Sequence, residues 1–168
     1  MADAPRTSQG PAEGGALQRL HMIDVAEKAP TKRRALARGR IQMSRESYDA
    51  IKHGKNPKGD VLAQAEVAGI LGAKRTSDLI PLCHPLPLDQ GRVGFDLLDD
   101  ACSIVAWCEA SATAKTGVEM EALTGVSCAL LAIYDLAKAV DPALTISGVH
   151  LSVKEGGKSG RWVHPDEK

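Results

Sequence analysis

Aromatic side chains are scarce in this chain, since one Phe, two Trp and two Tyr make up 3% of its 168 residues. Proteins that bind single-stranded nucleic acid stack bases on aromatic rings, so this scarcity argues against that class. An excess of either charge is also lacking, because 21 basic residues balance 21 acidic ones. Without a net field the chain has no general attraction to nucleic acid or to an anionic membrane. Any binding of anions must come from locally placed cations.

Long apolar runs and paired cysteine motifs are missing as well. No apolar run approaches the ~20 residues that span a bilayer, and the N-terminus lacks the apolar stretch of a signal peptide. The four cysteines, Cys83, Cys102, Cys108 and Cys128, are scattered without C-x-x-C spacing. We interpret them as reduced thiols, with Cys102 and Cys108 on the same face of one strand. These features predict a cytoplasmic protein with no membrane segment.

What the chain does contain is enough apolar material for one core, with 43% hydrophobic residues. We therefore predict a single domain over residues 19–160. Residues 1–18 combine Gly, Pro, Ala and Ser without a periodic apolar face, which predicts a disordered N-terminal tail. Residues 161–168 follow a glycine-rich stretch and are expected to form a flexible C-terminal tail.

The spacing of apolar residues predicts the order strand, two helices, two strands, helix, strand. The expected strands cover residues 34–44, 92–98, 102–112 and 144–154, and the expected helices cover 44–51, 60–75 and 117–140. Ser44 and Asp60 are the expected N-caps of the first two helices. The second helix carries a face of small residues that predicts a closely packed neighbour, namely Val61, Ala65, Ala68 and Gly72. Three prolines between residues 78 and 90 exclude a helix there. This order is the split βαβ pattern of an α+β, ferredoxin-like antiparallel sheet with helices packed on one face.

Four polar residues interrupt the apolar helix expected over residues 117–140: Glu119, Glu121, Asp135 and Lys138. Asp135 and Lys138 are three residues apart and can pair directly, although an ordinary surface ion pair is the simpler interpretation. Glu121 lies fourteen residues before Asp135, on nearly the same helical stripe but about 21 Å away. One long ligand, or two subunits that each supply one end, would use both residues. The geometry thus suggests a site shared across an interface.

The glycine-rich ending "GGKSG" resembles part of a P-loop but lacks its context. Ser152 stands where the first glycine of a P-loop is needed, and too few residues follow for the helix that faces the phosphates. We therefore reject a P-loop. Lys154 and Lys158 of this loop can still hold a phosphate through charge and backbone N–H groups, with a solvated tail as the alternative.

The segment "CHP" suggests a Cys-His pair or a metal ligand set. Neighbours in an extended segment point to opposite faces, which argues against a nucleophile dyad of Cys83 and His84. The remaining histidines lie apart without metal-ligand spacing, so we predict no metal site. For His84 alone, a structural histidine is the simpler interpretation.

Three long segments, "KGDVLAQAEVAGILGAKRTSDLIPLCHPLPL", "KTGVEMEALTGVSCALLAIYDLAKAVD" and "KEGGKSG", resemble the MoaC family of molybdenum cofactor biosynthesis. The resemblance covers about residues 21–160, and its one visible departure is Ser77, where family members often carry Trp. It implies a ferredoxin-like fold, a homohexamer built as a trimer of dimers, and an active site at the dimer interface. The implied activity is that of a cyclic pyranopterin monophosphate synthase, which acts on the cyclised dihydroguanosine triphosphate made by a radical-SAM partner and releases pyrophosphate.

The resemblance also implies roles for individual residues. Asp135 and Lys138 match the catalytic pair of the family. The matching substrate-binding positions are Lys58, Leu82, Cys83, His84, Glu119, Met120, Glu121 and Lys154. We add Lys158 and the set Arg33, Arg34, Arg38 and Arg40 as further cations for the triphosphate. No cofactor is certain. Magnesium often helps pyrophosphate to leave, although no carboxylate cluster in this sequence marks a metal site.

Two other classes of function stay in view. The first is a non-catalytic nucleotide-binding regulatory module, because ferredoxin-like domains often serve as regulatory binders. The second is a self-assembling interaction protein, whose small-residue helix faces would be oligomer contacts. Only the enzyme hypothesis requires Asp135 and Lys138 for turnover while assembly stays intact. The expected partners are the cyclised nucleotide and further copies of the chain, with no nucleic acid and no membrane.

Overall fold

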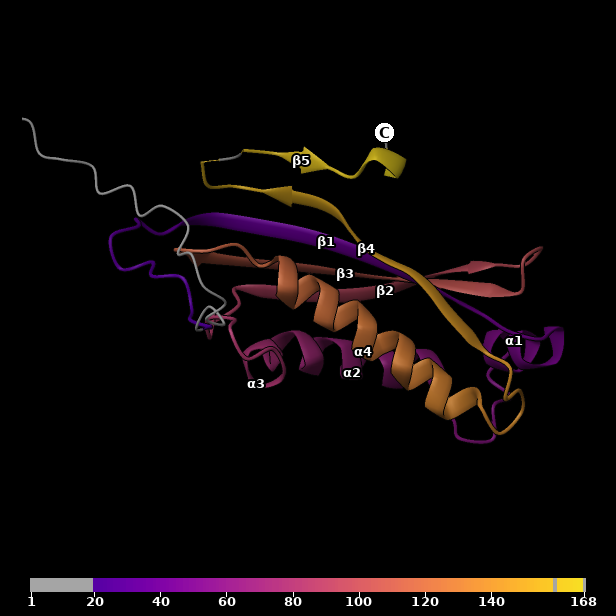
Figure 1. Ribbon diagram of the computed structural model, residues 1–168. Coiled ribbons are helices and arrows are strands. Elements are labelled where there is room, and N and C mark those ends of the chain that lie inside the picture. Colours follow the sequence, from indigo (N-terminus) through magenta and orange to yellow (C-terminus); the bar gives the residue numbers. More distant parts are fainter. Residues whose placement is uncertain (1–19, 159, 168) are drawn as a thin grey trace, which may run out of the picture.

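The structure is a computed structural model that describes residues 20–158 and 160–167 (Figure 1). Its strands are β1 (Thr31–Gln42), β2 (Gln90–Leu98), β3 (Ser103–Ala114), β4 (Thr145–Glu155) and β5 (Trp162–Val163). Its helices are α1 (Arg45–Lys52), α2 (Val61–Lys74), α3 (Thr76–Leu79), α4 (Glu119–Ala137) and the 3-10 helix η1 (Pro165–Glu167). Residues 1–18, predicted to be a disordered tail, lie outside the described residues.

The strands form one antiparallel sheet in the order β2-β3-β1-β4-β5, and α2 and α4 lie against one face of it (Figure 1). Strand β1 is central because it pairs with β3 along its whole length and with β4 on its other side. This arrangement confirms the predicted α+β, ferredoxin-like fold with helices on one face. Between the sheet and the helices lies the core.

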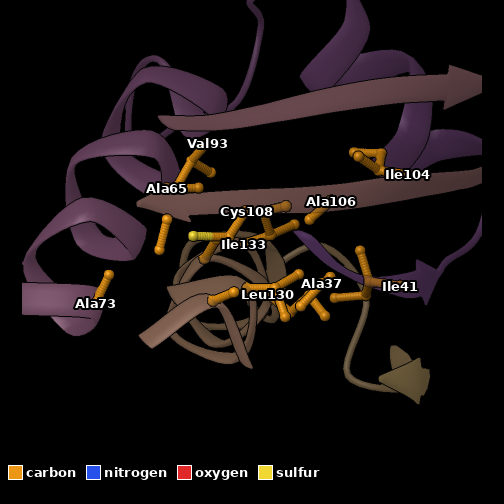
Figure 2. Close-up of a cluster of buried hydrophobic side chains, with 14 of the residues drawn as sticks. Ala37, Ile41, Ala65, Ala73, Val93, Ile104, Ala106, Cys108, Leu130 and Ile133 are labelled. Carbon is orange, nitrogen blue, oxygen red and sulfur yellow. The ribbon is translucent and has the colours of Figure 1, made fainter. Parts of the chain in front are cut away.

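The core follows from the alternation of side chains along the strands. On β1 every second residue from Ala35 onward is buried, and Ala106 and Cys108 on β3 face the same way. Leu130 and Ile133 of α4 belong to the same cluster of buried side chains (Figure 2). Ala35, Ala106, Cys108, Leu130 and Ile133 are each 0% exposed. Cys102, in contrast, lies in the turn before β3 with a positive φ of 44°, so its predicted place on a strand with Cys108 is wrong.

Helix α4 is, within the described residues, the single helix that is long and apolar enough to cross a membrane. A core helix passes the same test. Helix α4 packs on β1, β3 and α2 in the middle of the domain, and its residues from Ala122 to Ala137 supply much of the core.

Glycines let α2 and α4 approach each other closely, as the small-residue face predicted for residues 60–75 requires. A Cβ on Gly69 would lie 2.9 Å from the carbonyl oxygen of Gly125. A Cβ on Gly72 would lie 2.5 Å from Sγ of Cys128, and one on Gly125 would lie 2.4 Å from Sγ of Cys108. None of these sites has room for a side chain, so the position of α4 over the sheet depends on them.

The substitution Gly125→Val is therefore expected to destabilise the fold by about 1–3 kcal/mol through overpacking. Equilibrium urea unfolding measures this as a lower midpoint. Gly91→Val is the matched control, because a Cβ on Gly91 meets no atom of the described residues within 4 Å. Equal midpoints for the two variants would show that the close approach of the helices does not limit stability.

The predicted starts of α1 and α2 are confirmed by their side-chain caps. The Ser44 hydroxyl accepts from the Ser47 N–H at the start of α1, and the Asp60 carboxylate accepts from the Ala63 N–H at the start of α2. Short elements were missed, namely α3, β5 and η1. Strand β5 pairs Val163 with Val153 of β4, and such short elements carry too few residues for a periodic signal.

Candidate functional site

Three of the predicted site residues meet at the C-terminal end of α4. Lys138 Nζ lies 2.7 Å from Asp135 Oδ1, so the predicted pairing of these two residues is confirmed. Lys58, from the loop between α1 and α2, brings its Nζ within 2.9 Å of the Asp135 carbonyl oxygen and 3.5 Å of Asp135 Oδ2. All three side chains are exposed. We call Lys58, Asp135 and Lys138 the C-terminal cluster.

The charges of this cluster fix its protonation. The hydrogen bond and charge of Lys138, followed by the charge of Lys58, lower the pKa of Asp135. The Asp135 carboxylate in turn raises the pKa of Lys138. At neutral pH the cluster therefore holds a carboxylate that can accept a proton beside an ammonium that can donate one.

The other predicted side chains gather at the opposite end of α4, around a pocket of about 320 Å³. The prolines of residues 81–87 keep that segment out of a helix and lead it past the first turn of α4. The pocket is lined by Leu82, Cys83, His84, Glu119, Met120 and Glu121, together with Ile23, Val25, Lys28, Leu86, Thr116 and Gly117. We call this the N-terminal pocket. Its volume suits a small ligand.

Burial sets the electrostatics of the N-terminal pocket. Glu121 is only 4% exposed, and this burial, with a smaller contribution from the charge of Glu119, raises the pKa of its carboxyl group. Burial and the charge of Glu121 raise the pKa of the Cys83 thiol. Cys83 is thus a neutral thiol, which agrees with the rejection of a Cys-His nucleophile pair.

A lysine from the sheet borders the N-terminal pocket. Lys154, near the end of β4, lies with its Nζ 3.4 Å from Glu119 Oε1. Lys154 and Glu119 also line a smaller cavity of about 120 Å³ next to it, to which Arg33 and Arg34 contribute. Lys158 is exposed in the loop that follows β4. A phosphate at this cavity would meet positive charge from two adjacent strands.

The structure separates the four arginines proposed as phosphate ligands. Arg34 pairs with Glu109 and Glu155 on the neighbouring strands. Arg38 and Arg40 lie on the same face of β1 as Arg34, where Arg38 approaches Glu167 and the Arg40 Nε donates to the Ser103 hydroxyl. Arg33 points to the other face, against the glycine-rich loop after β4. Arg33 and Arg34 thus line the smaller cavity, whereas Arg38 and Arg40 lie away from it.

The N-terminal pocket and the C-terminal cluster lie at opposite ends of one helix. Glu121 is in the first turn of α4 and Asp135 is in its last turns, so their backbones are about 21 Å apart along the axis at 1.5 Å per residue. One chain therefore does not bring all of the predicted residues to one point.

A wall of the N-terminal pocket was missed by sequence reasoning. Ile23, Val25 and Lys28 line it, and Lys115 holds this segment by donating from Nζ to the Ala26 carbonyl at 2.8 Å. Ile23 and Val25 flank the polar Asp24, but this alternation is too short to predict an element.

A metal site is not built into the part of the chain that the structure describes. Residues 20–158 and 160–167 contain no group of three or more His, Cys, Asp or Glu side chains arranged to hold a metal ion.

The fold and the ionisable groups at both ends of α4 define a ferredoxin-like α+β domain with a candidate enzyme active site. The chain belongs to the MoaC family, whose family model matches residues 22–157. It is similar to the cyclic pyranopterin monophosphate synthase of Novosphingobium aromaticivorans, with 55% identity over 141 residues that cover 84% of this chain and 88% of the relative. The synthase of the same name from Helicobacter pylori is 52% identical over 143 residues, or 84% of this chain and 89% of the relative. The resemblance seen in the sequence is thereby confirmed.

Proposed function

We propose that this protein is a cyclic pyranopterin monophosphate synthase of molybdenum cofactor biosynthesis. It converts the cyclised dihydroguanosine triphosphate into cyclic pyranopterin monophosphate and releases pyrophosphate, which makes it a phosphorus–oxygen lyase. The observation that carries the proposal is the C-terminal cluster, in which Asp135 lies between Lys58 and Lys138. Relatives about 50% identical over most of the chain carry the same enzyme name.

The cluster provides the proton transfers that the rearrangement needs. Opening a ring between two nitrogens and closing it on another carbon requires protons to be removed and delivered at several centres. Asp135 accepts a proton, and Lys138 returns one. Each residue shifts the pKa of the other away from neutrality, so both are charged before the substrate binds. Lys58 stabilises the negative charge that develops beside them.

The last step forms a cyclic phosphate. A hydroxyl oxygen of the substrate attacks the phosphorus nearest the sugar, the bond from that phosphorus to the bridging oxygen breaks, and pyrophosphate leaves with the electron pair. The hydroxyl proton passes to a base. Lys154, Lys158 and Arg33 neutralise the phosphates, and local cations are required because the chain has no net charge.

The N-terminal pocket binds the part of the substrate derived from the purine. Leu82 and Met120 contact its ring faces, and His84 hydrogen-bonds its edge. Burial raises the pKa of the Glu121 carboxyl group, which lines the pocket where it can hydrogen-bond the substrate. Cys83 contributes shape as a neutral thiol, and Glu119 orients Lys154.

The active site is completed by a second chain within a cytoplasmic homohexamer built as a trimer of dimers. The separation of about 21 Å between Glu121 and Asp135 supports this part of the proposal, because one reacting ring cannot touch both residues on one straight helix. A partner chain supplies the C-terminal cluster opposite the N-terminal pocket.

The test is the reaction itself. The purified chain is incubated with the cyclised dihydroguanosine triphosphate, and the oxidised pterin and the pyrophosphate are measured together. One pyrophosphate for each pterin is the expected result. Nucleotide binding with no pterin above a heat-denatured control would contradict the proposal and would favour a regulatory binding module.

A further inference from the structure

Lys58 reaches Asp135 from a loop, so its backbone has no helix or strand to hold it. Two side chains hold the Lys58 backbone instead. The Lys58 N–H donates to Asn56 Oδ1 at 2.9 Å, and the Lys58 carbonyl oxygen accepts from Gln64 Nε2 at 3.0 Å. Both main-chain polar groups of this one residue are thus bound by side chains.

Asn56 is buried, whereas the residues around it in the loop face solvent. It is 6% exposed, although its neighbours from Lys52 to Lys55 and from Pro57 to Asp60 are exposed. Its side chain closes a turn onto Lys58, and its carbonyl oxygen accepts from the Gly59 N–H at 3.0 Å. Its Nδ2 is buried, and no residue within 20–158 or 160–167 forms a hydrogen bond with it. A buried amide that uses only its oxygen is a costly way to fill space, so the contact to Lys58 explains the residue better than packing does.

Gln64 anchors the same loop to α2. Its Nε2 donates to the carbonyl oxygens of both Lys58 and Asp60, the latter at 3.2 Å. Asp60 is the N-cap of α2, so Gln64 ties Lys58 to the first turn of a helix that is itself packed on α4. Asp135 lies on α4. Lys58, tied to α2, and Asp135, on α4, are therefore both anchored to the same packed pair of helices.

We infer that Asn56 and Gln64 are positioning residues that fix the backbone of Lys58 so that its ammonium group meets Asp135. A lysine side chain has four rotatable bonds, and its side chain here is 42% exposed, so a backbone that shifts would release Nζ into solvent. A displacement of about 1 Å in a catalytic group is enough to cost a large share of the rate. The consequence for turnover rests on the proposed function, whereas the contact to Asp135 does not.

A matched pair of variants isolates the hydrogen bond from the Lys58 N–H to the Asn56 side chain. Asn56→Ala and Asn56→Ser have nearly the same size, but the serine hydroxyl can still accept from the N–H two residues on. The first measurement is the pKa of the Asp135 carboxyl group, followed by NMR over a pH titration. Asn56→Ala is expected to raise it toward the value found in Lys58→Ala, and Asn56→Ser is expected to keep it closer to the wild-type value.

The second measurement is a double-mutant cycle on turnover. Asn56→Ala is expected to lower kcat about tenfold in the wild-type background and to have no further effect in the Lys58→Ala background, because it acts through Lys58. Gln64→Met is expected to behave in the same way. Equal Asp135 pKa values in Asn56→Ala and wild type, or an unchanged loss of kcat in the Lys58→Ala background, would overturn the inference. If the wild-type chain makes no pterin, the proposed function fails, and the NMR comparison alone decides the inference.

Discussion

Asp135→Asn is expected to lower turnover by about 10²–10⁴-fold, the range typical for loss of a general acid or base. The amide keeps the shape of the carboxylate, but it cannot accept a proton from the substrate. It also leaves Lys138 and Lys58 without the negative charge that they face. Because the side chain is exposed at the end of α4, the fold and the affinity for substrate should change little. Single-turnover kinetics and isothermal titration calorimetry measure the two effects separately.

The matched control for this variant is Asp49→Asn. Asp49 also forms an ion pair on a helix, with Arg45 at 3.7 Å, and its side chain is 46% exposed. Breaking this pair should leave turnover near the wild-type rate, as for most surface ion pairs. Turnover in Asp135→Asn that matched the Asp49→Asn variant would remove Asp135 from the chemistry.

Lys154→Ala is expected to weaken substrate binding about thirtyfold, which corresponds to about 2 kcal/mol, the lower end for loss of a phosphate-binding charge. Two effects combine in this variant. The phosphates lose a cation, and Glu119, released from its contact at 3.4 Å, adds a negative charge beside them. Measuring the Kd in an Asp135→Asn background avoids turnover during the titration.

Lys52→Ala is the control for the loss of one positive charge. Lys52 pairs with Asp99 at 2.7 Å and belongs to α1 rather than to the N-terminal pocket. Its removal should change the Kd for the substrate only slightly. Added salt should weaken substrate binding by both lysine variants. If the two lysine variants bound substrate equally well, Lys154 would not be a phosphate ligand.

Local patterns predicted the elements and the contacts that lie within one element. Apolar spacing located α2, α4 and the central strands, and a separation of three residues on a helix was enough to predict the ion pair of Asp135 with Lys138. The small-residue face of α2 predicted a close neighbour. That neighbour is α4, and the pattern alone did not identify it.

Contacts between distant segments left no such pattern. Lys58 is 77 positions from Asp135 in the sequence, and its place there depends on Asn56 and Gln64, which no motif marked. The arginines of β1 were grouped by charge, but strand alternation sends Arg33 to one face and Arg34 to the other. Tertiary packing decided these contacts. The resemblance to a family supplied the residue roles that spacing did not.

Co-refolding of two inactive variants tests most directly whether two chains complete one active site. Asp135→Asn carries a defect in the C-terminal cluster, and His84→Ala carries one in the N-terminal pocket. If the site combines Asp135 of one chain with His84 of another, half of the randomly formed dimers are mixed, and each mixed dimer has one intact site of two. Activity should then return to about a quarter of the wild-type level. Activity that stays at the level of the parent variants, with mixed oligomers confirmed by mass spectrometry, would contradict a site divided between these two residues.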